Sequence, residues 1–140
     1  MRNDLLPQLV IGLLVAAAIA LGLAVTGGPK AGQMEKRDQA RLGDLRNIGE
    51  YVLCLANHAD KTLPTELSED ATCMDMHGQV RLADPFNGEV YRYELLDSDT
   101  FRVCASFERY KGIEGAGYRA DGFSPESGCL TRAFTAADRD

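Results

Sequence analysis

The chain has 140 residues, enough for one domain with an appendage and too few for two ordinary enzymatic domains. Hydrophobic residues make up 45% of it and charged residues 26%, but the apolar residues are concentrated near the N-terminus. The formal net charge is -6 at pH 7. Because proteins hold phosphate backbones with clustered Lys and Arg, this charge argues against a nucleic-acid partner.

The N-terminal apolar segment is long enough to cross a membrane. Residues 9–25 are all apolar and would rise about 25 Å as a helix, and residues 5–26 reach the hydrocarbon thickness of about 30 Å. A cleaved secretory signal is the alternative, because Arg2 gives a basic start and Gly22-Leu23-Ala24 resembles a cleavage site. Signal-peptide apolar cores usually have about 7 to 15 residues. The greater length predicts an uncleaved anchor that contacts the lipid bilayer through residues 5–26.

Two features of the sequence point to opposite sides of the membrane. One basic residue, Arg2, precedes the apolar segment, and four follow it closely (Lys30, Lys36, Arg37, Arg41). Because basic residues tend to stay on the cytoplasmic side, this distribution would leave the C-terminal part in the cytoplasm. The four cysteines form an even set without a C-x-x-C pair, which favours two disulfides and an oxidising compartment. We expect a single-pass inner-membrane protein with a periplasmic C-terminal domain.

A long amphipathic helix is predicted after the anchor. Gly27-Gly28-Pro29 should end or kink the apolar helix, because paired glycines weaken a helix and proline removes a donor. Over residues 33–57 apolar side chains recur every three or four positions, which predicts a helix with one buried stripe (Leu42, Leu45, Ile48, Val52, Leu55). Several polar side chains fall off this stripe (Arg41, Asp44, Arg46, Asn47, Glu50). Residues 34–41 have little apolar surface, so we expect them to project through solvent as a stalk.

The remaining chain predicts a small sheet. Residues 61–80 are loop-like, with a short helical turn over 64–70. Residues 89–96 and 100–107 are rich in β-branched and aromatic residues and indicate a hairpin, preceded by a turn at residues 84–88. A glycine-rich surface loop over 109–128 leads to a last strand over 129–134. The expected fold is α+β, with an anchor and hinge over residues 1–29, a soluble domain over 30–134 and a disordered tail over 135–140.

The cysteines are the most informative chemical constellation. Cys54, near the end of the long helix, is expected to bond to Cys73 in the following loop, and Cys104 in the hairpin to Cys129 in the last strand. In the chain-entropy account each bond is worth about 3 kcal/mol. A zinc site formed by all four cysteines is the alternative, but the chain lacks the closely spaced cysteine pairs that such sites use.

Other candidate chemistry is weak. His58 at a helix end and the isolated His77 favour no ligand or catalytic role. Residues 112–117 hold three glycines, but in the wrong order for a phosphate-binding loop. Asp97-Ser98-Asp99 could bind calcium through its oxygen atoms, but a turn explains these residues equally well. The sequence therefore assigns no catalytic, cofactor or metal residue, and we expect a protein that is not an enzyme and uses no cofactor.

Several short motifs occur together within residues 5–108. After the apolar helix come R-x-x-D-L-R-x-I at 41–48, Leu63-Pro64, D-P-F-N-G-x-x-Y-x-Y at 84–93 and T-F-R-V-C-A-S-F-E at 100–108. This arrangement resembles the globular part of type II secretion pseudopilins and type IV pilin-like proteins. The resemblance implies a long helix lying on a small antiparallel sheet, with Tyr91 or Tyr93 buried against Leu45 and Ile48.

The chain departs from that family at the start of the apolar segment. Pilins carry a glycine, an aromatic residue and a glutamate there, whereas Gly12 is followed by residues 13–17, all Leu, Val or Ala. We therefore expect a domain held permanently on the membrane, with a structural or protein-interaction role in the cell envelope, through an envelope protein partner or self-association. The alternatives are a pseudopilin-like subunit that co-assembles in a secretion or pilus system, and a ligand-sensing periplasmic domain.

Overall fold

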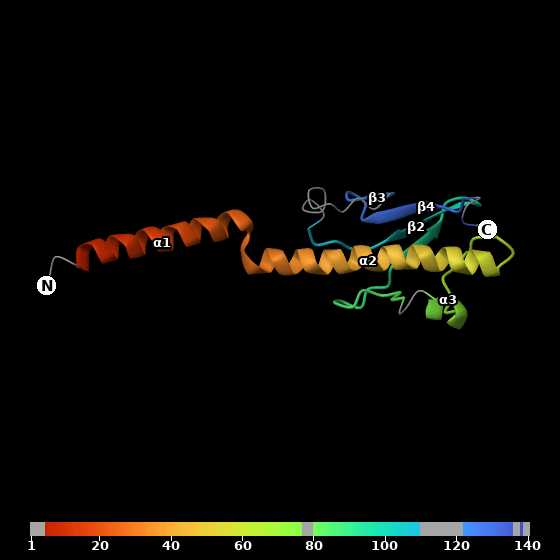
Figure 1. The fold of residues 1–140 in the computed structure, drawn as a ribbon. Coiled ribbons are helices and arrows are strands. Elements are labelled where there is room, and N and C mark those ends of the chain that lie inside the picture. Colours follow the sequence, from red (N-terminus) through yellow and green to blue (C-terminus); the bar gives the residue numbers. More distant parts are fainter. Residues whose placement is uncertain (1–4, 77–79, 110–121, 136–137, 139–140) are drawn as a thin grey trace. The chain divides into compact units, whose positions relative to one another are not determined.

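The computed structural model describes residues 5–76, 80–109, 122–135 and 138 (Figure 1). The chain divides into two compact units, Met1–Met34 and Glu35–Asp140. This division falls a few residues after the predicted boundary between residues 29 and 30. In the described part of the chain, helices are combined with a four-stranded antiparallel sheet, so the α+β class is confirmed.

The first helix, α1, spans Leu5–Thr26 in the N-terminal unit. Its 22 residues correspond to about 33 Å, close to the thickness of a bilayer's hydrocarbon core. Its Leu, Ile and Val side chains are exposed, Leu13 at 73% and Leu21 at 68%. Pro7 lies in the first turn, where a missing N–H breaks no helical hydrogen bond. Among the described residues, this is the one segment long and apolar enough to cross a membrane, by length and composition.

Gly27 separates α1 from the next helix, α2, which spans Gly28–His58. Gly27 and Gly28 have φ angles of 75° and 69°, a conformation that glycine adopts without the steric cost of a Cβ atom. The helical pattern is interrupted at Gly27, and Pro29 follows in the first turn of α2. The break expected at Gly27-Gly28-Pro29 is confirmed.

From Glu35 onward, α2 belongs to the C-terminal unit and contains most of the helix expected over residues 33–57. The predicted stripe is buried, with exposed fractions between 0% and 9% (Leu42, Leu45, Ile48, Val52, Leu55). Arg46, Asn47 and Glu50 are exposed, as expected from their positions off the stripe.

The solvated stalk expected over residues 34–41 is wrong, as is the exposed position expected for Arg41 and Asp44. Asp38, Arg41 and Asp44 are 1%, 2% and 2% exposed. Charged side chains are almost never buried this deeply unless they are paired with a group of opposite charge. The physical reason is that partners of opposite charge reach these positions from distant parts of the chain.

The sheet has the strand order β1-β2-β4-β3, with every neighbouring pair antiparallel. Its strands are β1 (Arg92–Leu95), β2 (Thr100–Cys104), β3 (Phe123–Ser124) and β4 (Cys129–Ala133). The first two form the expected hairpin, in which the Leu96 N–H donates to the Thr100 carbonyl over 2.9 Å. The expected last strand is present as β4 and lies between β2 and β3.

One face of this sheet packs on α2, and Figure 1 shows β2 and β4 running beside that helix. Alternate residues of a strand share a face, and Phe101 and Val103 of β2 are both fully buried. They join a hydrophobic core that also holds Leu45, Ile48 and Tyr91. The burial of Tyr91 against this part of α2 agrees with the expectation from the motifs. Full burial of each such aliphatic or aromatic side chain contributes about 1.5–3 kcal/mol.

A short helix, α3, spans Ala71–Met76, whereas the sequence favoured a helical turn over residues 64–70. Two backbone groups of that earlier segment are instead taken by one side chain. The Tyr51 hydroxyl donates to the Ser68 carbonyl over 2.5 Å and accepts from the Asp70 N–H over 2.7 Å. Asp70 then caps α3, because its Oδ1 accepts from the Cys73 N–H over 3.1 Å.

The glycine-rich segment over 109–128 contains the strand β3, which the sequence did not predict. A Cβ atom on Gly122 would lie 2.1 Å from the Thr131 carbonyl oxygen, so only glycine lets the chain approach β4 this closely. Residues 110–121 of the predicted loop lie outside the described residues. In the predicted tail only Thr135 and Asp138 are described, and the Asp138 carboxylate accepts from the Thr135 N–H over 2.8 Å.

Candidate functional site

Two disulfides tie the elements of the C-terminal unit together. Cys54 of α2 is bonded to Cys73 of α3, and Cys104 of β2 to Cys129 of β4. The second pair occupies directly opposite positions of neighbouring strands. These are the pairs that the positions in the sequence predict. With all four sulfurs bonded in pairs, the alternative four-cysteine zinc site is not formed in this structure.

A buried ion cluster is the main feature that the sequence reasoning missed. Arg41 of α2 donates from Nε to Asp84 Oδ2 over 2.6 Å, and from Nη1 to Asp38 Oδ1 over 2.7 Å. The same Nη1 lies 2.9 Å from Glu108 Oε1. Arg37, one helical turn earlier, makes two hydrogen bonds to the Glu108 carboxylate over 2.8 and 2.6 Å. The cluster joins the start of the C-terminal unit to two segments more than forty positions later.

Asp38 and Phe86 complete the surroundings of Arg41. Asp38 also accepts from two backbone N–H groups, those of Glu108 over 2.9 Å and Arg109 over 2.7 Å. The Phe86 ring lies against the guanidinium, with 5.7 Å between Cζ and the ring centroid. Every buried side-chain N or O atom of the described residues has a hydrogen-bond partner. The cluster is therefore satisfied without any further ligand.

A second polar group lies one turn further along α2. Asp44 Oδ2 accepts from the Tyr91 hydroxyl over 2.8 Å. Its Oδ1 accepts from Arg81, over 3.0 Å from Nε and 2.7 Å from Nη2. Burial, followed by the hydrogen bond to Asp44, raises the pKa of Tyr91 well above its usual 10.0. Tyr91 is thus a neutral hydrogen-bond donor at physiological pH.

These contacts give the sequence motifs a physical meaning. Two residues of the motif R-x-x-D-L-R-x-I bind two residues of the motif D-P-F-N-G-x-x-Y-x-Y. Arg41 binds Asp84. Asp44 binds Tyr91. Asp84 also shapes the turn, because its Oδ1 accepts from the Phe86 N–H over 2.8 Å. One signal could have revealed the buried charges: Asp38 and Arg41 continue backward the three-and-four spacing of Leu45 and the rest of the stripe.

The charges in the cluster hold one another in the ionised state. Burial acts to lower the pKa of Arg41, but its hydrogen bonds to Asp84, Glu108 and Asp38 outweigh this and raise the pKa above its usual value. The Arg37 hydrogen bonds, aided by Arg41, lower the pKa of Glu108 from 4.5 to about 2. Glu108 therefore remains charged throughout the mildly acidic range.

Acid should weaken this link in a way that a variant can reveal. Because the pKa of Glu108 is lower in the folded chain, its contribution is present above pH 4.5 and is lost as the pH falls toward about 2. We expect Glu108→Gln to lose less stability than the unmodified chain between these pH values, by up to about 1 kcal/mol because the pair is partly exposed. Thermal melting of both proteins across this range measures the difference. Glu69→Gln, at an exposed glutamate, is the control, and equal pH slopes for all three proteins would contradict the assignment.

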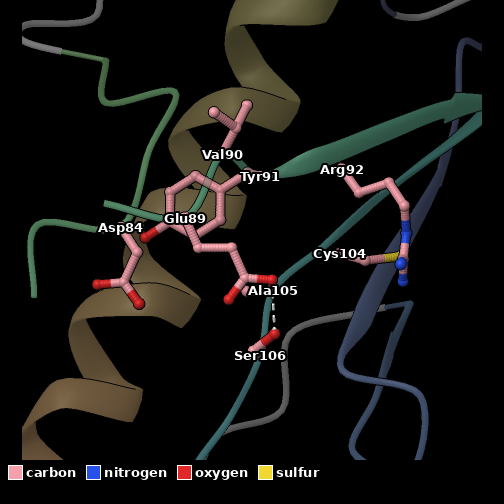
Figure 2. Close-up of a pocket in the computed structure, with 8 residues that line it drawn as sticks. All are labelled: Asp84, Glu89, Val90, Tyr91, Arg92, Cys104, Ala105 and Ser106. Carbon is pink, nitrogen blue, oxygen red and sulfur yellow. Dashed lines mark hydrogen bonds between the residues drawn. The ribbon is translucent and has the colours of Figure 1, made fainter. Parts of the chain in front are cut away.

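The hollow drawn in Figure 2 is small. It is lined by Asp84, Tyr91 and Arg92 and by the end of β2 around Cys104. Glu89 and Ser106, which point toward each other in the picture, are joined by a 2.9 Å hydrogen bond. The hollow in Figure 2 has a cavity volume of about 30 Å³, which is room for about one water molecule. A wider hollow of about 480 Å³ lies over the ion cluster and is lined in part by Arg37, Phe86 and Glu108.

The remaining candidates of the sequence are placed as follows. His58 is exposed at the end of α2, close to the Cys54–Cys73 disulfide. Asp97 accepts from the Asp99 N–H over 2.9 Å, the hydrogen bond of a turn. His77 and the glycine-rich residues 112–117 lie outside the described residues.

No protein-family model, curated protein or solved structure matches this chain. The likeness to pseudopilins therefore depends on the motifs alone.

Proposed function

We propose that the chain is a non-enzymatic, single-pass membrane protein that displays its disulfide-stabilised C-terminal unit on the periplasmic side of an inner membrane. Its role is structural or lies in contact with another envelope protein. The observation that carries the proposal is the combination of a predominantly apolar α1 with exposed side chains and a separate compact unit closed by two disulfides.

The apolar helix supports the membrane part of the proposal. In water, a row of exposed Leu, Ile and Val along 22 residues would be strongly unfavourable, whereas in a bilayer each lowers the insertion free energy by about 0.3–0.6 kcal/mol. The helix also satisfies its own backbone hydrogen bonds, as a spanning segment must.

The disulfides support the periplasmic part. Disulfides persist in oxidising compartments and are rare in the cytosol. Both bonds join elements that are far apart in sequence, with separations of 19 and 25 residues. The ion cluster supports a structural role, since its buried side chains bind one another.

Thiol and protease accessibility in cells expressing the full chain test this proposal. We expect the chain to stay in the membrane at full length after alkaline carbonate extraction, and external protease to remove the C-terminal unit from spheroplasts. A maleimide that does not cross membranes should modify its cysteines only after a reductant is added. Thiols that react only after the membrane is permeabilised would place the unit in the cytoplasm, and a shortened soluble product would identify α1 as a cleaved signal.

A second candidate is a pseudopilin-like subunit that co-assembles through its membrane helix. The meeting of the two pilin-like motifs through Arg41–Asp84 and Asp44–Tyr91 favours it. Chemical crosslinking of the same cells distinguishes the two candidates. A ladder of crosslinked copies supports co-assembly, and isolated monomers remove it.

A further inference from the structure

We propose that reduction of the Cys54–Cys73 disulfide turns the end of α2 into a binding site for a thiophilic metal ion, with zinc as the occupant. The ligands are the two cysteine sulfurs and one imidazole nitrogen of His58. In the oxidised chain the two cysteines form a disulfide beside His58, so this end of the helix has an oxidised state and a reduced, metal-binding state.

The geometry that carries the proposal is the closeness of three ligand atoms. Cys54 Sγ, Cys73 Sγ and a ring nitrogen of His58 all lie within 4.8 Å of one another. Among the described residues this is the one such group of three His, Cys, Asp or Glu side chains. Cys54 and His58 are four positions apart on α2 and therefore project from the same face of the helix.

The third ligand is brought in by the chain reversal after α2. Cys73 stands in the first turn of α3 and is fully buried, and its N–H is held by the Asp70 carboxylate. The Cα atoms of Cys54 and Cys73 are 5.8 Å apart, so rotation of the two side chains is enough to part the sulfurs while the backbone stays in place. Two thiolates on one tetrahedral zinc ion lie about 3.8 Å apart, given Zn–S distances of about 2.3 Å.

The ligand set selects the class of metal. Thiolates with an imidazole suit zinc and copper(I), whereas calcium and magnesium prefer oxygen ligands. Three protein ligands leave one position of a tetrahedral zinc ion open, and His58 is exposed, so water can complete the coordination. The exposed imidazole of His58 is the ligand that an ion from solvent meets first.

The redox step balances when the reductant is a dithiol. The dithiol transfers two electrons and two protons to the Cys54–Cys73 bond and becomes a disulfide itself, leaving two cysteine thiols. Zinc binding then displaces both thiol protons to solvent, because the ligands are thiolates. Of the two cysteines, Cys54 is the more exposed, at 6% against 0% for Cys73.

The second disulfide supplies an internal control. Cys104 and Cys129 face each other across β2 and β4, and the described part of the chain places no third ligand of the four types beside them. Reduced Cys104 and Cys129 therefore offer two sulfurs only. A site formed by thiols in general would appear at both pairs, whereas the proposed site requires His58.

Cobalt and zinc titrations of the purified full chain in detergent test the proposal, because cobalt bound to thiolates absorbs light by charge transfer. After reduction and anaerobic removal of the reductant, we expect one cobalt ion per chain, displaced by zinc, and no such absorption for the oxidised chain. His58→Ala should lower the affinity by at least about tenfold, the lower bound for loss of a supporting group around a zinc ion. Because His58 is exposed, this change should leave the fold intact.

Paired cysteine variants locate the site. Cys104→Ser with Cys129→Ser should keep the absorption, and Cys54→Ser with Cys73→Ser should abolish it. The proposal is overturned if the reduced chain binds neither metal, if His58→Ala binds as tightly as the unmodified chain, or if the absorption survives loss of Cys54 and Cys73. Displacement of cobalt by copper(I) but not by zinc would support the site and correct the occupant. All these measurements are made in solution, so they are independent of the side of the membrane on which the unit lies.

Discussion

Replacing Arg41 by Met is expected to destabilise the C-terminal unit by roughly 3–5 kcal/mol, the usual cost of removing one partner of a buried ion pair. The change leaves Asp38 and Asp84, 1% and 4% exposed, without the guanidinium that neutralises them. Met keeps much of the aliphatic volume of Arg, so the loss reports charge and hydrogen bonding more than packing. A domain of ordinary stability, about 5–15 kcal/mol, would lose a large part of it.

Chemical denaturation of the two proteins measures this difference as a shift of the unfolding midpoint. Arg46→Met is the matched control, because Arg46 is on the same helix but exposed, and it should change stability by no more than about 0.5 kcal/mol. Adding Asp38→Asn and Asp84→Asn to Arg41→Met should recover part of the loss, since no unpaired charge then remains. Equal midpoints for Arg41→Met and Arg46→Met would show that the cluster contributes nothing to the fold.

Replacing Leu45 by Asp should prevent the C-terminal unit from folding. Leu45 is fully buried in the core between α2 and the sheet. Loss of a core leucine alone costs about 2–5 kcal/mol, and an unpaired carboxylate in the same place adds several more. The sum approaches or exceeds the whole stability of a small domain.

Circular dichroism melting of the purified chain provides the measurement, with the disulfides kept oxidised. We expect the cooperative transition of the C-terminal unit to disappear, while the signal from α1 in detergent persists. Asn47→Asp introduces the same carboxylate two positions away on the exposed face of α2 and should melt like the unmodified chain. A normal transition for Leu45→Asp would rule out the packing of α2 on the sheet.

The parts of the fold that follow from local pattern could be predicted from the sequence. The run of apolar residues gives α1, the three-and-four spacing of Leu45, Ile48 and Val52 gives the buried face of α2, and alternation along residues 100–104 gives β2. The glycine pair after α1 marks the break between the helices. Each of these depends on neighbours within a few positions, and such information is present in the chain itself.

The candidate site could not be predicted in the same way, because its partners are distant. Arg41 and Asp84 are 43 positions apart, and Arg41 and Glu108 are 67 apart. A hydrophilic stretch such as residues 34–41 suggests solvent exposure until a partner of opposite charge is known to lie opposite it. The prediction of a helical turn over residues 64–70 in place of α3 is wrong for a related reason. The Tyr51 hydroxyl, which comes from another helix, forms hydrogen bonds to backbone groups of residues 68 and 70.

The position of β4 in the sheet has a consequence for biosynthesis. This strand is the last in sequence, yet it lies between β2 and β3 and supplies Leu130 to the core. The sheet and its second disulfide are therefore completed only after the residues up to Ala133 have left the ribosome. Until then Phe101 and Val103 have an unpaired neighbouring edge, and nascent chains that stop before Cys129 are the ones we expect chaperones and proteases to remove.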